Sequence, residues 1–381
     1  ETDTADRLES DLFREDEGSE PQSGWTNTAD GAPFGEKDLS AQSDTAFSYG
    51  YSQLSGDEQQ LYREILNSLL SCQEETELSV KDPEMVERVF RYVMADHPEI
   101  FYADGYEVTT YRLGTELRRI TFTGTWTLES DEVLSRRAQL EAAAALWLEG
   151  LPDGTDDFEK AKYIYDALIL RTEYEQGSAD SQTICSVLLN QRSVCQGYAK
   201  TFQYLCQLAG IPAMLVTGDV NGEGHAWNIV FLDGDWYYID PTWGDASYQR
   251  EEGEETPALT ETVNYDYFCV TTQEIERTHS MDDNQLLPVC NAVQDQYYRH
   301  EGLYLQSADK EKIDEIFVRA AQKGAPMVCF QCADDTVYQE VYRLLIEEQG
   351  IFAYLPESET TAAYLDSDRE RTFYFWFTEV S

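Results

Sequence analysis

The amino-acid sequence predicts an α+β fold in which helices come first, an antiparallel sheet follows, and a small two-layer α/β unit ends the chain. Three observations predict this. Apolar residues keep helical spacing in four segments before residue 172. Two strand-like segments flank Asp233-Gly234, a dipeptide that is typical of a tight hairpin turn. Beyond residue 306, the order helix, strand, helix, strand, strand is typical of a two-layer unit of about 75 residues.

Composition limits the possible functions. The 381 residues include 27 Lys or Arg and 73 Asp or Glu, so the formal net charge is -46. This length predicts roughly two globular domains with a tail, and a hydrophobic content of 42% is enough to form real cores. The negative charge argues against nucleic-acid partners, which need clusters of Lys and Arg, and against docking on an anionic membrane. No apolar run approaches the roughly 20 residues of a membrane span.

Residues 1–46 are rich in Asp, Glu, Ser, Thr and Gly, and we expect them to form a disordered acidic linker. The chain begins at Glu1 without the basic and apolar regions of a signal peptide. We expect an extracellular or cell-surface protein that is lipid-anchored through a missing N-terminal segment, with residues 1–46 as its stalk. The alternative is a flexible leader without a role.

Residues 47–150 are predicted to form an N-terminal subdomain of helices and strands. Ser55 is a good N-cap for a first helix. Asp82 can cap a second helix, and Pro83 occupies the first position of that helix. The stretch from Tyr102 to Leu128 alternates and is rich in Tyr, Thr, Val and Ile, which predicts strands. Further helices are predicted at 131–148 and 156–171.

Residues 151–306 contain the densest chemistry, and residues 307–381 are predicted to form a separate small α/β domain. The segment QYYRHEGLYL, at the end of the first of these regions, has a strand-like composition. In the second region we expect helices at Lys310–Gln322 and Thr336–Glu348, and strands at APMVCF, IFAYL and TFYFWFTEV.

A buried helix is predicted to begin at or near Cys195. Apolar residues follow at helical spacing, Gly210 stands where a helix needs a left-handed closing residue, and Pro212 blocks continuation. The N-terminus of a helix presents unpaired N–H groups and positive partial charge, which favour a thiolate and could hold a developing oxyanion.

A hairpin brings two further residues together. With Asp233 and Gly234 at the centre of the turn, Asp240 faces Trp227, and His225 is its diagonal neighbour on the same face. Such neighbours lie about 7–8 Å apart at Cα, within reach of His and Asp side chains.

A cysteine at a helix start, with a strand-borne histidine and aspartate, supplies a nucleophile, a base and an orienting group. Cys195 would attack an acyl carbon, and His225 would accept the thiol proton and later protonate the leaving amine. Asp240 would bind the far imidazole nitrogen and fix its tautomer. Alone, each residue is more readily explained by packing; the combination is the stronger signal.

The motifs VCQGYA, GHAWN and DPTW, in this order and spacing, resemble the transglutaminase-like superfamily, a branch of the papain-like cysteine enzymes. The resemblance is close over 160–245, looser to about 305, and strongest to extracellular bacterial proteins, many of them lipoproteins. It implies a papain-like core in which the nucleophile helix packs on an antiparallel sheet. It also implies that Cys195, His225 and Asp240 form a catalytic triad for acyl chemistry on amides.

Further residues are candidates for the wall of the site. Core packing is an equal alternative for the candidates that match the family motifs. For Gln191 and Tyr174, the alternative is an exposed or packed position in a loop. The candidates are Gln196, Gly197, Tyr198, Trp227, Asn228, Trp243, Gln191, which could donate to an oxyanion, and Tyr174. The other histidines, His97, His279 and His300, stand in unremarkable contexts and are expected to be structural or exposed.

No cofactor or metal site is expected. The chain lacks a GQCW-type motif and the regular ligand spacing of an EF-hand, so calcium-dependent cross-linking is disfavoured relative to peptidase or amidase activity. Cys329 and Cys332 form a lone CxxC, too little for a zinc site.

Three hypotheses follow for function. The first is a cysteine peptidase, amidase or transamidase acting on peptides or proteins, cell-wall peptides included. The second is a non-catalytic surface-binding module, which would be free to lose the triad, and the third is an adhesin or scaffold built on the C-terminal unit. No acidic residue occurs from Gln191 to Phe202, where Arg192 and Lys200 flank the thiol. The charge elsewhere should attract cationic or neutral peptides.

Overall fold

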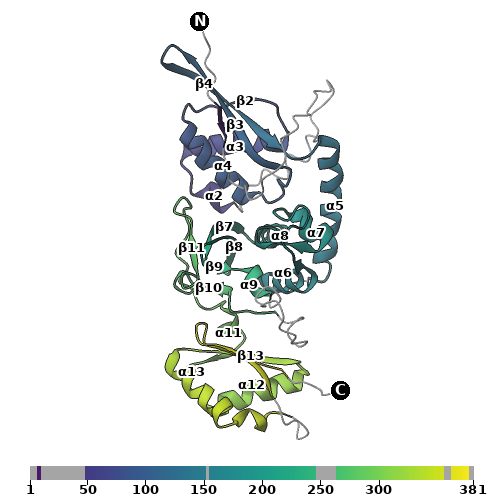
Figure 1. Ribbon diagram of the computed structural model, residues 1–381, viewed down its shortest axis with the longest axis vertical. Coiled ribbons are helices and arrows are strands. Elements are labelled where there is room, and N and C mark those ends of the chain that lie inside the picture. The colour runs from purple at the N-terminus through teal and green to yellow at the C-terminus, as the bar shows by residue number, and fades with distance from the viewer. Residues whose placement is uncertain (1–6, 10–47, 152–153, 246–262, 356–361, 377–381) are drawn as a thin grey trace.

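The computed structural model describes residues 7–9, 48–151, 154–245, 263–355 and 362–376. Figure 1 shows three parts stacked along the long axis, each with its own sheet. The fold is therefore α+β, as the sequence predicts. Of the segment 1–46, only Arg7–Glu9 is described, and the linker prediction otherwise lies outside the described residues. The domain boundaries stay a prediction.

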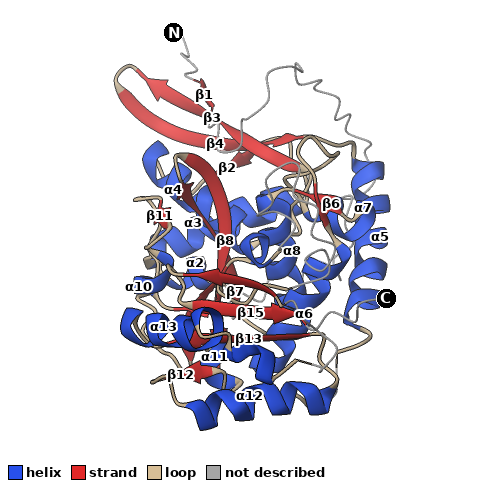
Figure 2. Cartoon of the chain, turned by 60° about the horizontal axis from the view of Figure 1, so that its bottom comes forward, coloured by secondary structure: helices blue, strands red, loops and turns tan. Residues whose placement is uncertain are grey.

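The first part is a four-stranded sheet of order β1-β3-β4-β2 with helices packed against it. Its elements are β1 (Arg7–Glu9), α2 (Tyr49–Ser52), α3 (Gly56–Leu70), β2 (Thr76–Glu77), α4 (Pro83–Asp96), β3 (Ala103–Leu113) and β4 (Glu116–Trp126). The helix α5 (Ser130–Leu148) follows and lies alongside the middle part (Figure 1). Ser55 and Glu58 form a capping box at α3, and the Asp82 carboxylate accepts the first N–H groups of α4. Figure 2 shows the β3–β4 hairpin extending away from the body.

The middle part contains the predicted helix and hairpin. Its elements are α6 (Asp157–Arg171), β5 (Glu173–Tyr174), α7 (Ile184–Asn190), β6 (Arg192–Ser193), α8 (Cys195–Leu208), β7 (Ala213–Val220), β8 (Glu223–Leu232), β9 (Asp235–Ile239), α9 (Pro241–Gly244), β10 (Phe268–Val270), α10 (Thr272–Ile275), β11 (His279–Met281) and α11 (Tyr297–His300). Five of these strands form an antiparallel sheet of order β10-β9-β8-β7-β11, on which α8 packs. Helix α7 and strand β11 were not predicted.

Two polar side chains of α8 bind the end of α4. Gln203 Nε2 donates to the carbonyl of Ala95 at 2.7 Å, and Gln207 Nε2 donates to that of Asp96 at 2.9 Å. The Asp96 carboxylate is itself buried and accepts from the backbone of Gly50 and from the hydroxyl of Tyr62. These contacts fix α8 between the first part and its own sheet.

The last part has the predicted order of helices and strands. Its elements are β12 (Tyr304–Leu305), α12 (Lys310–Lys323), β13 (Met327–Cys332), α13 (Asp335–Tyr342), the π-helical turn η3 (Arg343–Glu347), the 3-10 helix η4 (Gly350–Ala353), β14 (Ala363–Ser367) and β15 (Thr372–Trp376). They form a sheet of order β12-β13-β15-β14 over a hydrophobic core of its own.

Two strand predictions were wrong. IFAYL lies in η4 and the turn after it, and the fourth strand is the more polar β14 instead. QYYRHEGLYL contains α11, where Tyr297 stacks on Tyr265 and Tyr298 is buried, and only its end forms β12. Tertiary burial of the tyrosine rings overrides their strand preference.

The last part contacts the middle part through buried polar groups. The Asp266 carboxylate accepts from Tyr298 Oη at 2.6 Å, Tyr374 Oη at 2.9 Å and Thr372 Oγ1 at 3.1 Å. Nearby, Tyr267 Oη donates to Glu370 Oε1 at 2.8 Å. The loop that precedes β10 is therefore anchored to the hairpin of β14 and β15.

Candidate active site

Cys195 is the first residue of α8. Val194 supplies an extended N-cap, and the first turn contains no acidic side chain. The first backbone bonds of the helix run from the N–H groups of Gly197 and Tyr198 to the carbonyl of Val194. Because these bonds begin at Gly197, the N–H groups of Cys195 and Gln196 are left at the open end of the helix. Cys195 is half-buried, whereas the other seven cysteines are buried.

The start of α8 is fixed by close packing around Gly197. The hydroxyls of Ser193 and Ser186 are 2.7 Å apart, and that of Ser193 donates to the carbonyl of Ser181 at 3.0 Å. A Cβ on Gly197 would collide with all three serines. Glycine at this position therefore permits the close approach of these serines to the start of the helix.

The hairpin has the predicted register. Asn228 pairs with Ile239 and Leu232 with Asp235, around a turn in which Asp233 and Gly234 both have positive φ. His225 Nε2 lies 2.8 Å from Asp240 Oδ2, so the predicted proximity of these side chains is confirmed. His225 is 7% exposed and Asp240 is 0% exposed.

The hydrogen bonds assign the two nitrogens of His225. Nε2 faces a carboxylate, which only accepts, so this nitrogen carries a proton and donates it. Nδ1 is then the nitrogen left to accept the thiol proton of Cys195, whose proximity contributes to the raised pKa of His225. His225 is thus hydrogen-bonded to Asp240, and Cys195 lies near enough to His225 to raise its pKa.

Charge pairing stabilises the ionised forms of this group. Burial alone would lower the pKa of His225, but the charge and hydrogen bond of Asp240, followed by those of Cys195, raise it from 6.5 to about 10. Burial would raise the pKa of Asp240, yet the charge and hydrogen bond of His225, assisted by His279, hold it well below its usual range.

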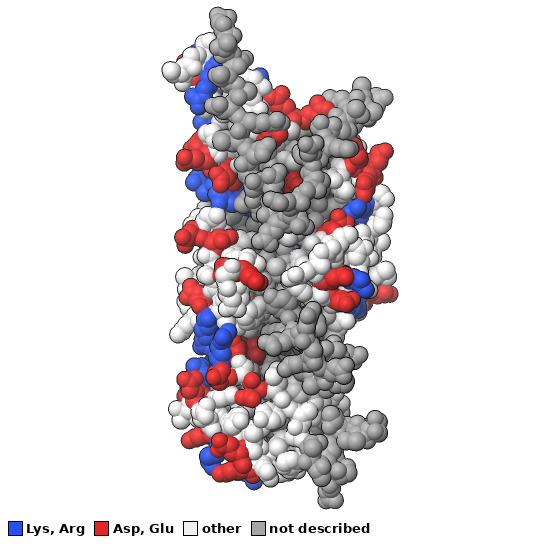
Figure 3. All heavy atoms as spheres, in the orientation of Figure 1, with Lys and Arg blue, Asp and Glu red and all other residues white. Residues whose placement is uncertain are grey.

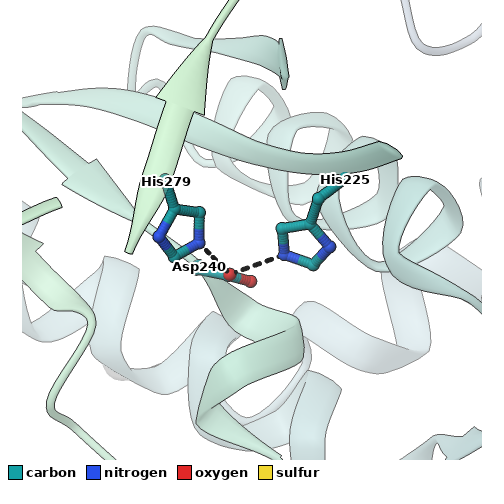
Figure 4. Close-up of side chains that lie close together, drawn as sticks. All are labelled: His225, Asp240 and His279. Carbon is teal, nitrogen blue, oxygen red and sulfur yellow. Dashed lines mark hydrogen bonds and ion pairs between the residues drawn. The ribbon is translucent and has the colours of Figure 1, made fainter. Parts of the chain in front are cut away.

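Asp240 accepts four hydrogen bonds. Its carboxylate is the N-cap of α9, where Oδ1 accepts from the backbone N–H of Thr242 at 2.9 Å and of Trp243 at 3.2 Å. Oδ2 accepts from two histidines, His225 at 2.8 Å and His279 at 3.0 Å. Figure 4 shows the two rings on either side of Asp240, both directed at the same oxygen.

The prediction that His279 stands in an unremarkable context was wrong. His279 lies on β11, which pairs with β7, and its side chain is 0% exposed. Its Nδ1 lies 2.7 Å from Thr278 Oγ1, and its Nε2 bonds Asp240. No local motif marks it, because the contact joins residues 39 positions apart in the chain.

Two predicted wall residues pack around this cluster. The Trp227 ring lies 5.9 Å from that of His225 and 4.8 Å from that of His279, and the Trp243 ring lies 5.0 Å from that of His279. Tyr267 completes the enclosure at 5.5 Å from His279. These aromatic rings shield the histidine–aspartate pairs from water.

Other predicted wall residues make structural contacts. Asn228 Nδ2 donates to the carbonyls of Ala199 and Met214, which ties α8 to the sheet. Tyr198 Oη donates to Thr172 O at 3.0 Å and to Asp245 Oδ2 at 2.9 Å. For both side chains, the packing alternative describes the observed contacts.

The remaining candidates lie around the start of α8. Gln191 is exposed and ends α7 in the left-handed conformation, and Tyr174 pairs with Ser193 through β5 and β6. Gln196 is half-buried, and within the described residues its Nε2 is buried without a hydrogen-bond partner. Gln196 is therefore a better candidate than Gln191 for a polar side chain beside the thiol.

The flanking cations differ from what the sequence suggested. Arg192 is exposed and lies 3.4 Å from the carboxylates of both Glu173 and Glu175, so its charge is paired. Lys200 is buried in α8, and burial lowers the pKa of its ammonium group to about 8. The acid-free stretch of sequence therefore lies next to Glu173 of strand β5 and to Glu175, which follows that strand. Figure 3 shows acidic side chains interspersed with smaller clusters of Lys and Arg on the visible face.

Two groups of possible metal ligands occur among the described residues. The donor atoms of His225, Asp240 and His279 lie within 4.8 Å of one another, as do those of Glu159, His300 and Glu301. In the first group, Nε2 of His225 and Nε2 of His279 are already hydrogen-bonded to Oδ2 of Asp240.

Comparisons with known proteins match this region of the chain to one family. The Transglutaminase-like superfamily matches residues 148–241, which include Cys195, His225 and Asp240. The kyphoscoliosis peptidase of Homo sapiens is 33% identical over a stretch covering 25% of this chain and 17% of that protein, and the Mus musculus protein is 32% identical with the same coverage. The chain thus spans about a sixth of these relatives.

Solved structures give more distant matches. The crystal structure of a TGase is 14% identical, with a TM-score of 0.27, and covers 48% of this chain and 54% of that one. The periplasmic domain of TgpA from Pseudomonas aeruginosa is 16% identical, with a TM-score of 0.24, and covers 38% of this chain and 72% of that one.

The chain carries a domain of the transglutaminase-like superfamily. Members of this superfamily are typically cysteine enzymes. Within the described residues, no helix combines the length and apolar character needed to cross a membrane.

Proposed function

We propose that the protein is a cysteine-dependent acyl-transfer enzyme that acts on peptide or protein amides through Cys195, His225 and Asp240. The observation that carries the proposal is the group at the start of α8: a half-buried thiol, an imidazole whose pKa that thiol helps to raise, and a buried carboxylate 2.8 Å from the far imidazole nitrogen. These are the parts of an activated nucleophile, in the order that the chemistry needs.

The first half of the reaction forms a thioester. Cys195 Sγ attacks the amide carbon while Nδ1 of His225 holds the thiol proton, and the carbonyl oxygen becomes an oxyanion. The N–H groups of Cys195 and Gln196 at the open end of α8 are suited to stabilise that charge. The C–N bond then breaks as His225 protonates the leaving amine.

The second half releases the acyl group. His225 takes a proton from water or from an amine, which attacks the thioester and expels the thiolate. Water gives peptidase or amidase activity, and an amine gives transamidation. Asp240 keeps Nε2 protonated throughout, so Nδ1 is always the nitrogen that exchanges the proton.

Mass spectrometry of a peptide library incubated with the full chain tests the proposal. We expect hydrolysis to give two products whose summed mass exceeds that of the peptide by 18 Da, and transfer to give an acyl product that carries the added primary amine in place of the leaving amine; we expect neither with Cys195→Ala. Cys206→Ala is the matched control, because Cys206 lies on the same helix but is fully buried, so this variant should keep the activity. Turnover that survives Cys195→Ala would refute the proposal.

A further inference from the structure

The Asp240 carboxylate has more partners than a triad requires. A carboxylate offers about four lone-pair positions, and Asp240 uses them for two backbone N–H groups and two histidines. Three of these partners come from the hairpin and its continuation into α9. The fourth, His279, comes from β11 at the opposite edge of the sheet.

His279 is itself held in place. Thr278 Oγ1 lies 2.7 Å from its Nδ1, so Nε2 is directed at the carboxylate. The rings of Trp227, Trp243 and Tyr267 surround the imidazole at 4.8, 5.0 and 5.5 Å. Tyr267 is anchored by its hydroxyl to Glu370 of the last part of the chain.

A free carboxylate can rotate about its Cβ–Cγ bond. The backbone N–H groups of Thr242 and Trp243 hold Oδ1, which leaves Oδ2 to meet the proton of His225. His279 holds Oδ2 from the other side, with no water needed in a site where both side chains are 0% exposed. Loss of this donor would leave a buried lone pair unsatisfied and allow Oδ2 to turn away from His225.

We propose that His279 is a positioning residue of the active site, which fixes Oδ2 of Asp240 so that His225 keeps the tautomer needed to serve Cys195. This inference rests on the proposed function. It extends the triad to a chain of four side chains, in which His279 touches neither thiol nor substrate and acts through Asp240.

Two substitutions separate the hydrogen bond from the packing. His279→Phe keeps a ring among the three aromatic side chains but has no donor, whereas His279→Gln places an amide N–H where Nε2 stood. In the full chain we expect His279→Phe to lower kcat/KM about ten- to a hundredfold, mainly in kcat, and His279→Gln to restore most of it. His97→Phe is the matched control, because it also removes a buried histidine bonded to a carboxylate, that of Glu99 at 2.8 Å.

A second readout needs no substrate. The chain has only 4 histidines, so ¹⁵N-histidine NMR can follow each imidazole separately. The titratable groups in contact with His279 are Asp240, His225 and Tyr267. In His279→Phe we expect the pKa of His225 to fall and its Nδ1–H tautomer to become populated, while His279→Gln and His97→Phe keep the wild-type titration.

The outcomes distinguish this inference from the proposed function. If the wild type shows no Cys195-dependent turnover, the proposed function fails, and the NMR titration still reports whether His279 fixes the His225–Asp240 pair. If folded His279→Phe keeps the wild-type kcat/KM and His225 titration, the positioning role is refuted. It is also refuted if folded His279→Gln is as impaired as His279→Phe. Should His279→Phe not fold, the Gln variant must still show the wild-type titration of His225.

Discussion

Replacement of Asp240 by Asn separates the charge of this side chain from its shape. The amide oxygen can still accept from the backbone of α9, but the negative charge beside the two histidines disappears. In the native protein that charge and its hydrogen bond, followed by those of Cys195, overcome burial and raise the pKa of His225 from 6.5 to about 10. At about 1.4 kcal/mol per pH unit, this difference favours the imidazolium by about 5 kcal/mol.

The assay is an NMR titration of ¹⁵N-labelled histidine in the wild type and in Asp240→Asn. We expect the wild-type His225 to lose its proton near pH 10 and the variant to lose it at a much lower pH, because burial remains and the larger opposing contribution, that of Asp240, is gone. With the imidazole in the wrong tautomer, kcat/KM should fall about 10³- to 10⁴-fold.

The pH dependence of the free energy of unfolding tests the His225–Asp240 pair independently. Because the folded-state pKa of His225 lies above 6.5, its contribution is complete below that pH and is lost as the pH rises through about 10. The wild type should therefore lose free energy of unfolding across this interval, and the variant should lose much less. A His225 that still titrates near pH 10 in Asp240→Asn would refute the reasoning.

Three further predictions concern the surroundings of the site. Gly197→Ala should destabilise the fold by about 1–3 kcal/mol in urea titrations, because a Cβ there collides with Ser193 and Ser181, whereas Gly56→Ala, in open space on α3, should not. Asn228→Leu should lower the free energy of unfolding by about 1–3 kcal/mol by leaving the carbonyls of Ala199 and Met214 without this donor; the exposed Asn67→Leu is its control, and equal stabilities would contradict the assignment. If the net charge of -46 steers substrates, kcat/KM for a Lys-rich peptide should fall with ionic strength while that for a neutral peptide stays level; equal salt dependence would exclude steering.

The parts of the site that the sequence predicts are those set by local signals. The start of α8 follows from the apolar spacing after Cys195 and the Gly210–Pro212 stop, and Gly210 does adopt a positive φ. The pairing of β8 with β9 follows from a two-residue turn, which fixes the facing of every residue on both strands. His225 and Asp240 therefore meet for reasons contained within a short stretch of chain.

His279 could not be found in this way. Its place depends on which strand pairs with the far edge of β7, and that pairing is a long-range choice without a turn signal. The failure at IFAYL has a similar origin, since Ile351 is buried in the last core from a 3-10 helix rather than from a strand. The CxxC motif was also uninformative: Cys329 packs into the large core, which has residues from all three parts, and Cys332 packs into the separate core of the last part, so the two thiols lie in different hydrophobic clusters.

The central claim is that His225 activates Cys195. The most direct test is the rate at which iodoacetamide alkylates Cys195 at mildly acidic pH, compared between the wild type and His225→Ala. Exposure of the thiol is a property of α8 and should be the same in both proteins, so a difference in rate reports the imidazole. We predict fast, selective alkylation in the wild type and a fall to the rate of an ordinary thiol in the variant. Equal rates in the two proteins would contradict the account.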